Sequence, residues 1–146
     1  MRVKAHCGGA RMTEEMYNEF SKPIFYANKK LFIKKGKWND LKKKPILEFI
    51  SDSTGNFSFS LPPGEYCIVD EYKNDKTNYN KLLNKFKEPT LHYSAISSSC
   101  LKEWFKTPAA VLNIPSSGLN NFVITFYDEC SWNKVPCATY HGPLPP

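Results

Sequence analysis

The cysteines are the residues of this chain with the most evident chemistry, and they lie far apart, at Cys7, Cys67, Cys100, Cys130 and Cys137. No two of them form a Cys-x-x-Cys pair, the spacing typical of zinc ribbons and of thioredoxin-like redox sites. Scattered cysteines at this density are typical of disulfide-bonded proteins in oxidising compartments. Because five is an odd number, at least one thiol stays unpaired within the chain. About 15 pairings then remain, and the sequence does not decide among them.

We expect at least one disulfide, engaging Cys130 or Cys137, because the Pro-rich tail around them has little else to hold it. These two cysteines could close a small loop together, or each could reach a distant partner. Cys67 falls inside a predicted strand, which favours a core residue or a bridged one over a catalytic thiol. A catalytic thiol would need a nearby base and a partly exposed, electropositive setting.

Soft metal ligands gather near the N-terminus, where His6 and Cys7 are followed by Met12 and Met16. Such ligands suit copper or zinc. Neighbouring strand residues point to opposite faces, however, and the methionines fit the apolar face of a helix. We therefore expect no metal site and no cofactor, and we keep a metal-handling protein that uses His6 and Cys7 as an alternative.

The remaining candidates for catalysis show no recognisable arrangement. The three histidines, His6, His92 and His141, have neither metal-ligand spacing nor the order of a catalytic triad. No nucleophile lies in a recognisable elbow, and no glycine-rich loop precedes a helix to hold phosphate. The sequence thus predicts no catalytic residues, and we expect the protein not to be an enzyme.

Lysines crowd one stretch, residues 29–44, which holds eight of them against a single acid, Asp40. Such a stretch can attract a polyanion such as lipopolysaccharide, an acidic glycan or nucleic acid. It can equally be a solvated strand edge, where lysine discourages edge-to-edge pairing. The possible polyanion surface consists of Lys29, Lys30, Lys34, Lys35, Lys37, Lys42, Lys43 and Lys44.

The kind of basic residue argues against nucleic acid as the partner. The net charge is +6, but of 20 basic residues only Arg2 and Arg11 are arginines. Readers of bases and phosphates prefer the planar guanidinium of arginine, which donates two parallel hydrogen bonds. The partner stays unidentified at this point, with a cell-envelope glycan or protein as the leading possibilities.

The elements that must position these residues are mostly strands. A chain of 146 residues predicts one domain, 1–146. The segment FSFSL alternates strictly between large apolar residues and serine, the pattern of a half-buried strand, and Gly55 before it is available for a turn with positive φ. The predicted strands are 2–6, 30–35, 45–51, 57–61, 65–72, 109–114 and 121–127.

Helical periodicity interrupts this pattern. Thr13, followed by two glutamates, predicts a short helix that ends before Pro23. Tyr79, Leu82, Leu83 and Phe86 recur at helical spacing, and a similar pattern follows Ser97. These segments predict a helical insertion over about 77–106. The Pro-rich C-terminal tail covers about 129–146, and no stretch approaches the roughly 20 apolar residues of a membrane span.

The motif at residues 52–66 carries a family resemblance. It reads Asp52-x-x-Gly55-x-Phe57-x-Phe59-x-Leu61-Pro62-Pro63-Gly64-x-Tyr66. This string resembles the signature of carboxypeptidase-regulatory-like domains, which are transthyretin-like (prealbumin-like) modules exported by Bacteroidetes-type bacteria. The resemblance implies a mostly β fold, a Greek-key β-sandwich of about seven strands with short helical insertions. The segments 6–16 and 130–146 also resemble uncharacterised bacterial proteins of this architecture.

The resemblance implies a function as well. Domains of this kind usually accompany other activities, so we expect a non-catalytic binding or structural module of a bacterial envelope, with an unknown ligand. One enzyme of transthyretin fold is a small hydrolase whose chain ends in Tyr-Arg-Gly-Ser. The nearest string here is Tyr140-His141-Gly142-Pro143, which lacks the Arg and Ser. A small hydrolase therefore stays only as an alternative.

The expected location is periplasmic or extracellular. The chain opens MRVKAHCGGA, which lacks the apolar segment of a signal peptide. Either the protein is cytosolic or a leader has been removed, and the cysteine content favours the second interpretation.

Overall fold

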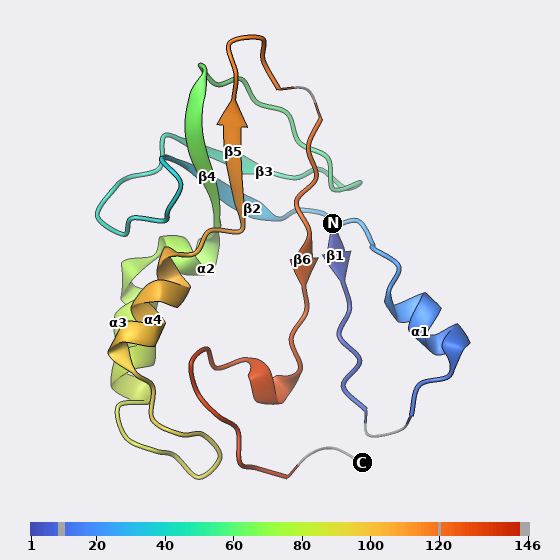
Figure 1. Cartoon of the computed structure of the whole chain (residues 1–146), viewed down its shortest axis with the longest axis vertical. Helices are drawn as coiled ribbons and strands as arrows, with labels where there is room; N and C mark the ends of the chain where they lie inside the picture. The colour runs from blue at the N-terminus through green and yellow to red at the C-terminus, as the bar shows by residue number, and fades with distance from the viewer. Residues whose placement is uncertain (9–10, 120, 144–146) are drawn as a thin grey trace.

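The computed structural model describes residues 1–8, 11–119 and 121–143, and its centre is a four-stranded antiparallel sheet (Figure 1). The strand order is β3-β2-β4-β5. The bounds are Lys30–Lys35 for β2, Leu47–Ile50 for β3, Gly64–Asp70 for β4 and Ala110–Ile114 for β5. The ladder between β2 and β4 sets Lys34 opposite Cys67 and Ile33 opposite Ile68.

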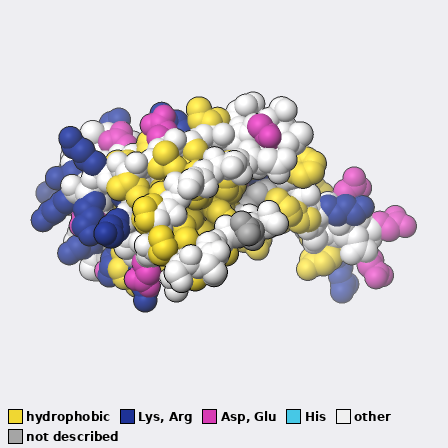
Figure 2. Space-filling view, turned by 90° about the horizontal axis from the view of Figure 1, so that it is seen from above, with side chains coloured by type: hydrophobic (Ala, Val, Ile, Leu, Met, Phe, Trp, Pro, Cys, Tyr) yellow, Lys and Arg dark blue, Asp and Glu magenta, His cyan; other side chains and the backbone are white. Residues whose placement is uncertain are grey.

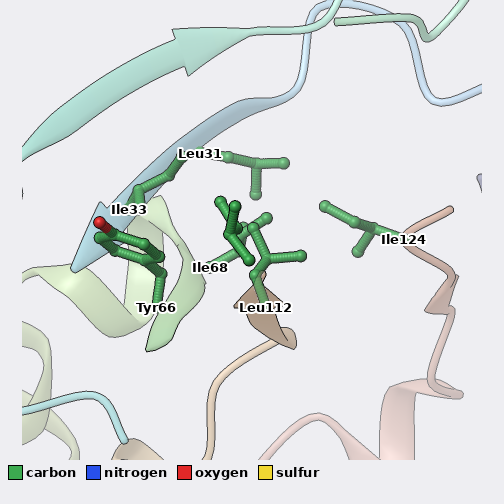
Figure 3. Close-up of a cluster of buried hydrophobic side chains, with 7 residues drawn as sticks. Leu31, Ile33, Tyr66, Ile68, Leu112 and Ile124 are labelled. Carbon is green, nitrogen blue, oxygen red and sulfur yellow. The ribbon is translucent and has the colours of Figure 1, made fainter. Parts of the chain in front are cut away.

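One face of this sheet carries the first apolar core, which Figure 3 shows. Its buried members are Leu31, Ile33, Tyr66, Ile68, Leu112, Ile114 and Ile124. Phe57, Phe59 and Leu61 pack against this core, whereas Ser58 and Ser60 are exposed, as the alternation predicted. Gly55 has a φ of 79°, so the predicted glycine turn before this segment is also confirmed.

Three helices follow β4, and Asp70, the last residue of β4, is the N-cap of the first helix. They are α2 (Glu71–Asn74), α3 (Lys76–Lys85) and α4 (Ser98–Lys106). Asp70, Asp75 and Ser97 each accept a hydrogen bond from a backbone N–H of the first turn, which fixes the three starting points. The second apolar core lies among these elements and consists of Phe86, Ile96, Leu101 and Phe105.

A small parallel sheet joins the N-terminal strand to a strand late in the chain. β1 (Arg2–Val3) pairs with β6 (Phe126–Tyr127), and Arg2 Nε donates to Asp128 Oδ1 at 2.6 Å. α1 (Glu14–Phe20) begins at Thr13, whose side chain accepts from the backbone N–H of Met16, as predicted, and it buries no residue. A short 3₁₀ helix, η1 (Ser131–Asn133), lies in the tail.

The expectation of a seven-stranded Greek-key sandwich was wrong. The structure has 24% helix and 21% strand, with one sheet of four strands and one of two, so the fold is mixed α and β. The physical reason lies in the backbone. Segment 57–61 packs its side chains like a strand but joins no ladder, and only Phe126–Tyr127 of the predicted strand 121–127 is paired. The predicted strand 65–72 ends at Asp70, because that side chain caps α2.

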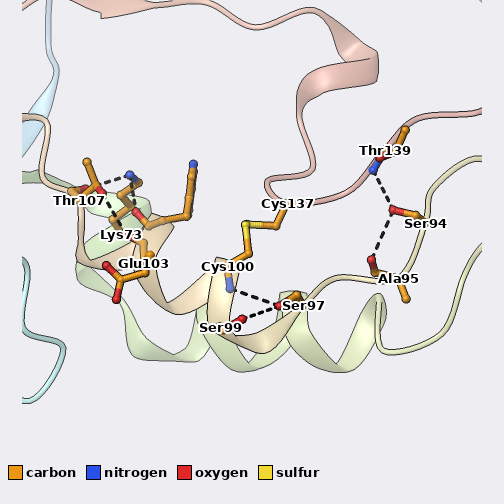
Figure 4. Close-up of a disulfide and its surroundings, with 11 residues drawn as sticks. Lys73, Ser94, Ala95, Ser97, Ser99, Cys100, Glu103, Thr107, Cys137 and Thr139 are labelled. Atoms are coloured by element: carbon orange, nitrogen blue, oxygen red, sulfur yellow. Dashed lines mark hydrogen bonds between the residues drawn. A yellow bond between two sulfur atoms is a disulfide. The ribbon is translucent and has the colours of Figure 1, made fainter.

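Two disulfides hold the tail, which confirms the prediction for Cys130 and Cys137. Cys7 is bonded to Cys130, and Cys100 in α4 is bonded to Cys137 (Figure 4). Both tail cysteines therefore reach distant partners rather than each other. Cys67 is the unpaired cysteine and is fully buried in β4, as expected for a core residue.

Candidate anion-binding groove

Lysine side chains gather at one end of the molecule, the end that carries the β2–β3 connection (Figures 1 and 2). A groove with a volume of about 550 Å³ opens there. Its walls come from three segments: the β2–β3 connection, the first half of α3 and the second half of α4. The lysines that line it are Lys35, Lys37, Lys42, Lys43, Lys76, Lys102 and Lys106.

The inner surface of the groove is apolar. Leu41, Tyr79 and Phe105 contribute to it, and the rings of Tyr79 and Phe105 meet edge to face with centroids 5.5 Å apart. Phe105 is 1% exposed and belongs to the second core, so this surface is continuous with the interior of the helical part. Trp38 lines the same groove but is 55% exposed. The groove therefore combines an apolar inner surface with a cationic rim.

Most of the rim charge is uncompensated. Lys37 pairs with Glu65 at 3.1 Å and Lys106 with Glu103 at 3.3 Å, both on exposed side chains where such pairs contribute little. No ion pair within the described part of the chain involves the other five lining lysines. Asp40 is the single acid among the lining residues, and its Oδ1 accepts from the backbone N–H of Lys42. Like charges around a low-dielectric surface reinforce one another and attract anions.

A buried asparagine fixes the β2–β3 connection against the helices. Asn39 is 3% exposed, and its Nδ2 donates to the carbonyl oxygens of Lys73 (2.8 Å) and Phe105 (2.9 Å). Its backbone N–H donates to the carbonyl of Lys106 at 2.9 Å. Its Oδ1 accepts from Lys34 Nζ at 2.8 Å. The side chain of Asn39 is thus hydrogen-bonded to β2, α2 and α4. These bonds anchor the chain segment that carries its neighbours Trp38 and Asp40.

Lys34 is an interior residue, which corrects its predicted place on the polyanion surface. It is 1% exposed, and its ammonium donates to Asn39 Oδ1 and, at 3.1 Å, to the carbonyl of Asp40. Burial lowers the pKa of Lys34 from its ordinary value of 10.5. Its cross-strand neighbour Cys67 has its pKa raised by burial. Strand alternation explains why the surface prediction failed for Lys34. Its side chain lies on the same face of β2 as that of Phe32, and this face is covered at Lys34 by Asn39 and Asp40 of the β2–β3 connection.

A second lysine closes the end of α4. Lys73 Nζ donates to the carbonyl of Thr107 at 3.0 Å (Figure 4). It also donates to the carbonyl of Trp104 at 2.8 Å and lies 4.0 Å from the centroid of the Trp104 ring. Burial lowers the pKa of Lys73 too. A cation at a helix C-terminus satisfies carbonyls that have no partner within the helix. This contact holds α2 to α4, and α4 forms one wall of the groove.

The other predicted lysines divide between the groove and the rest of the surface. Lys35, Lys37, Lys42 and Lys43 line the groove. Lys44 is exposed outside its lining. Lys30 pairs with Glu48 at 2.8 Å, and Lys29 lies over the rings of Tyr26 and Phe126.

Sequence reasoning missed four residues of the site, namely Trp38, Lys76, Lys102 and Lys106. The three lysines lie on α3 and α4, far along the chain from residues 29–44, and only the packing of these helices brings them to the β2–β3 connection. Trp38 carried a usable signal, since a tryptophan among lysines in a connection of polar residues has no strand or helix face to pack on.

The alternative metal site at His6 and Cys7 loses one of its ligands. The Cys7 sulfur is bonded to Cys130, and a disulfide sulfur is not a thiolate ligand. The His6 ring contacts that of Phe20, with centroids 5.5 Å apart. Within the residues that the structure describes, no three His, Cys, Asp or Glu side chains lie together as metal ligands would.

A second cavity, of about 730 Å³, lies beside the sheet core between segments 54–61 and 121–124. Phe57, Phe59, Leu112 and Phe122 are among the side chains that line it. No side chain among its described lining residues is charged, and the N-terminal ammonium of Met1, which also lines it, donates to the carbonyl of Ile124.

No family model, curated protein or solved structure matches this chain. No helix in the described part of the chain is long and apolar enough to cross a membrane. The two disulfides are compatible with an oxidising, extracytoplasmic location.

Proposed function

We propose that the protein is a non-catalytic binding module of a bacterial envelope and that it captures polyanions in the lysine-rimmed groove. The observation that carries this proposal is the convergence of seven lysines from three chain segments around one groove that contains a single acid. A lysine stretch that merely protects a strand edge would need no contribution from α3 and α4.

The proposed location is the periplasm or the cell exterior. Both disulfides support it, because such bonds persist in oxidising compartments. The likeness of residues 52–66 to exported bacterial accessory domains supports a bacterial envelope as the setting. Anionic polymers are common in that setting, and a cationic surface would bring the protein to them at rates that depend on salt.

The experiment compares two triple variants of equal charge. Lys42, Lys43 and Lys102 become serine in the first, and the exposed lysines Lys4, Lys22 and Lys134, outside the groove lining, become serine in the second. Both proteins are passed over an immobilised sulfated polysaccharide, and their affinities are measured between 50 and 300 mM NaCl, about the range over which polyanion contacts weaken steeply.

We expect the groove variant to bind more weakly than the control variant and to lose about three units from the slope of log affinity against log salt. Equal losses in the two variants would show that net charge, rather than the groove, governs binding. No binding by the wild-type protein would overturn the proposed function itself.

A further inference from the structure

Trp38 gives the groove a feature that charge attraction alone does not require. Its side chain is 55% exposed, although a tryptophan carries one of the largest apolar surfaces of any residue. It lines the groove together with Leu41, Tyr79 and Phe105. We propose that the ligand is an acidic glycan, one sugar ring of which stacks on Trp38 while neighbouring lysines pair with its carboxylate or sulfate groups. This inference rests on the proposed function.

The chain segment that carries the indole is anchored before any ligand binds. Asn39, the next residue, is held by three side-chain hydrogen bonds and one backbone bond. Lys106 Nζ lies 5.1 Å from the centroid of the Trp38 ring, a cation–π distance. The ring therefore loses little freedom when a flat apolar group contacts it, and such preorganisation favours binding.

The chemistry around the indole matches that of a charged sugar. A pyranose ring has an apolar face of C–H groups, hydroxyls at its edge and, in acidic glycans, an anionic substituent. The groove supplies an aromatic ring for the face and lysines for the anion. The exposed side chain of Asn80, also in the lining, supplies a neutral donor and acceptor for hydroxyls.

Nucleic acid is the rival with similar chemistry, and three observations disfavour it. None of the lining residues is an arginine, the residue that recognises phosphate through two parallel hydrogen bonds. Of the aromatic residues in the lining, Trp38 is exposed, Tyr79 is half-buried and Phe105 is buried, whereas single-stranded nucleic acid is bound by successive exposed aromatic side chains. The two disulfides point to an oxidising compartment and away from the cytosol and nucleus, where nucleic acids are held.

The test uses three probes of matched charge: a sulfated hexasaccharide, an oligoglutamate, which has no ring, and an oligothymidylate. Each is titrated against wild type, Trp38→Ala, Trp38→Phe and the control Ile46→Ala. Ile46 is 52% exposed, lies in the same connection and is not part of the groove lining. Circular dichroism and thermal unfolding confirm that each variant folds.

We expect Trp38→Ala to lower the affinity for the hexasaccharide about tenfold, an effect toward the lower end of those measured for loss of one base–aromatic stacking contact. Trp38→Phe should recover part of this loss, and the affinity for oligoglutamate should change less than twofold. Ile46→Ala should leave all three affinities unchanged.

Two results would overturn the inference and leave the proposed function standing. The first is an equal loss for hexasaccharide and oligoglutamate, which would mean that Trp38 makes no ring contact. The second is tighter, Trp38-dependent binding of oligothymidylate, which would make the ligand a single-stranded nucleic acid. Absence of binding to all three probes would instead overturn the proposed function.

Discussion

Replacing Asn39 with alanine should destabilise the protein strongly, because this one side chain joins β2 to both α2 and α4. The change removes two donated hydrogen bonds, to the carbonyls of Lys73 and Phe105. It also removes the Oδ1 acceptor for Lys34 Nζ, which leaves that buried ammonium donating to the carbonyl of Asp40, at 3.1 Å. A net loss of about 1 kcal/mol for each neutral bond and about 2 kcal/mol for the charged one gives roughly 4 kcal/mol.

A double-mutant cycle separates the Lys34–Asn39 contact from the other two bonds. Lys34→Met removes the buried ammonium and leaves Asn39 Oδ1 without that donor. In the double variant both the ammonium and the Oδ1 acceptor are gone, so neither is left buried without the other. The double variant should therefore be about 2 kcal/mol more stable than the sum of the two single losses predicts.

The assay is urea unfolding followed by circular dichroism, with the free energy of unfolding extrapolated to water for wild type, the two single variants, the double variant and a control. Asn80→Ala is the matched control, because Asn80 is an exposed asparagine of the same groove. It should change stability by less than about 0.5 kcal/mol. If Asn39→Ala costs no more than Asn80→Ala, or if the losses of Lys34→Met and Asn39→Ala simply add, the buried contact does not hold the groove as described.

Three further predictions concern other parts of the molecule. Alkylation under denaturing, non-reducing conditions should label one thiol, that of Cys67, and alkylation after reduction should add five labels by mass. A different number of labels before reduction would contradict the disulfide assignment. Phe59→Ala should cost about 2 kcal/mol in urea unfolding, less than a fully buried phenylalanine because the ring is half-buried, whereas exposed Ser58→Ala should cost almost nothing. Burial lowers the pKa of Lys34 below 10.5, so just below pH 10.5 the unfolded chain binds more protons than the folded protein, and this residue makes stability rise with pH. Lys34→Met should flatten that rise in unfolding curves measured between pH 8 and about 10.5, and an unchanged slope would contradict the burial of the ammonium.

Local patterns predicted the elements well where one physical signal acted alone. The helical spacing that begins at Tyr79 correctly indicated α3, because an apolar stripe at that period fits only a helix packed on one side. The strand over 30–35 matches β2 residue for residue. The alternation of 57–61 correctly separated packed phenylalanines from exposed serines.

The wider architecture could not be predicted from these patterns, since alternation reports side-chain packing and not backbone pairing. Segment 57–61 places Phe57 and Phe59 on the sheet core without joining a ladder, so it looked like a strand of a second sheet. The groove was only half predictable for a related reason. Lys76 and Lys102 come near Lys42 through the packing of α3 against α4 and through the hydrogen bonds of Asn39 to α2 and α4, contacts that no local pattern encodes.

The most direct test of the central claim, that the lysine-rimmed groove is the binding surface, is a map of backbone amide shifts by NMR during titration with the sulfated hexasaccharide. The account predicts salt-sensitive shifts in residues 36–43, 76–80 and 102–106, the three walls of the groove. Residues 14–20 of α1 should stay unshifted. Shifts confined to residues 54–61 and 121–124 around the apolar cavity, or to α1, would contradict it.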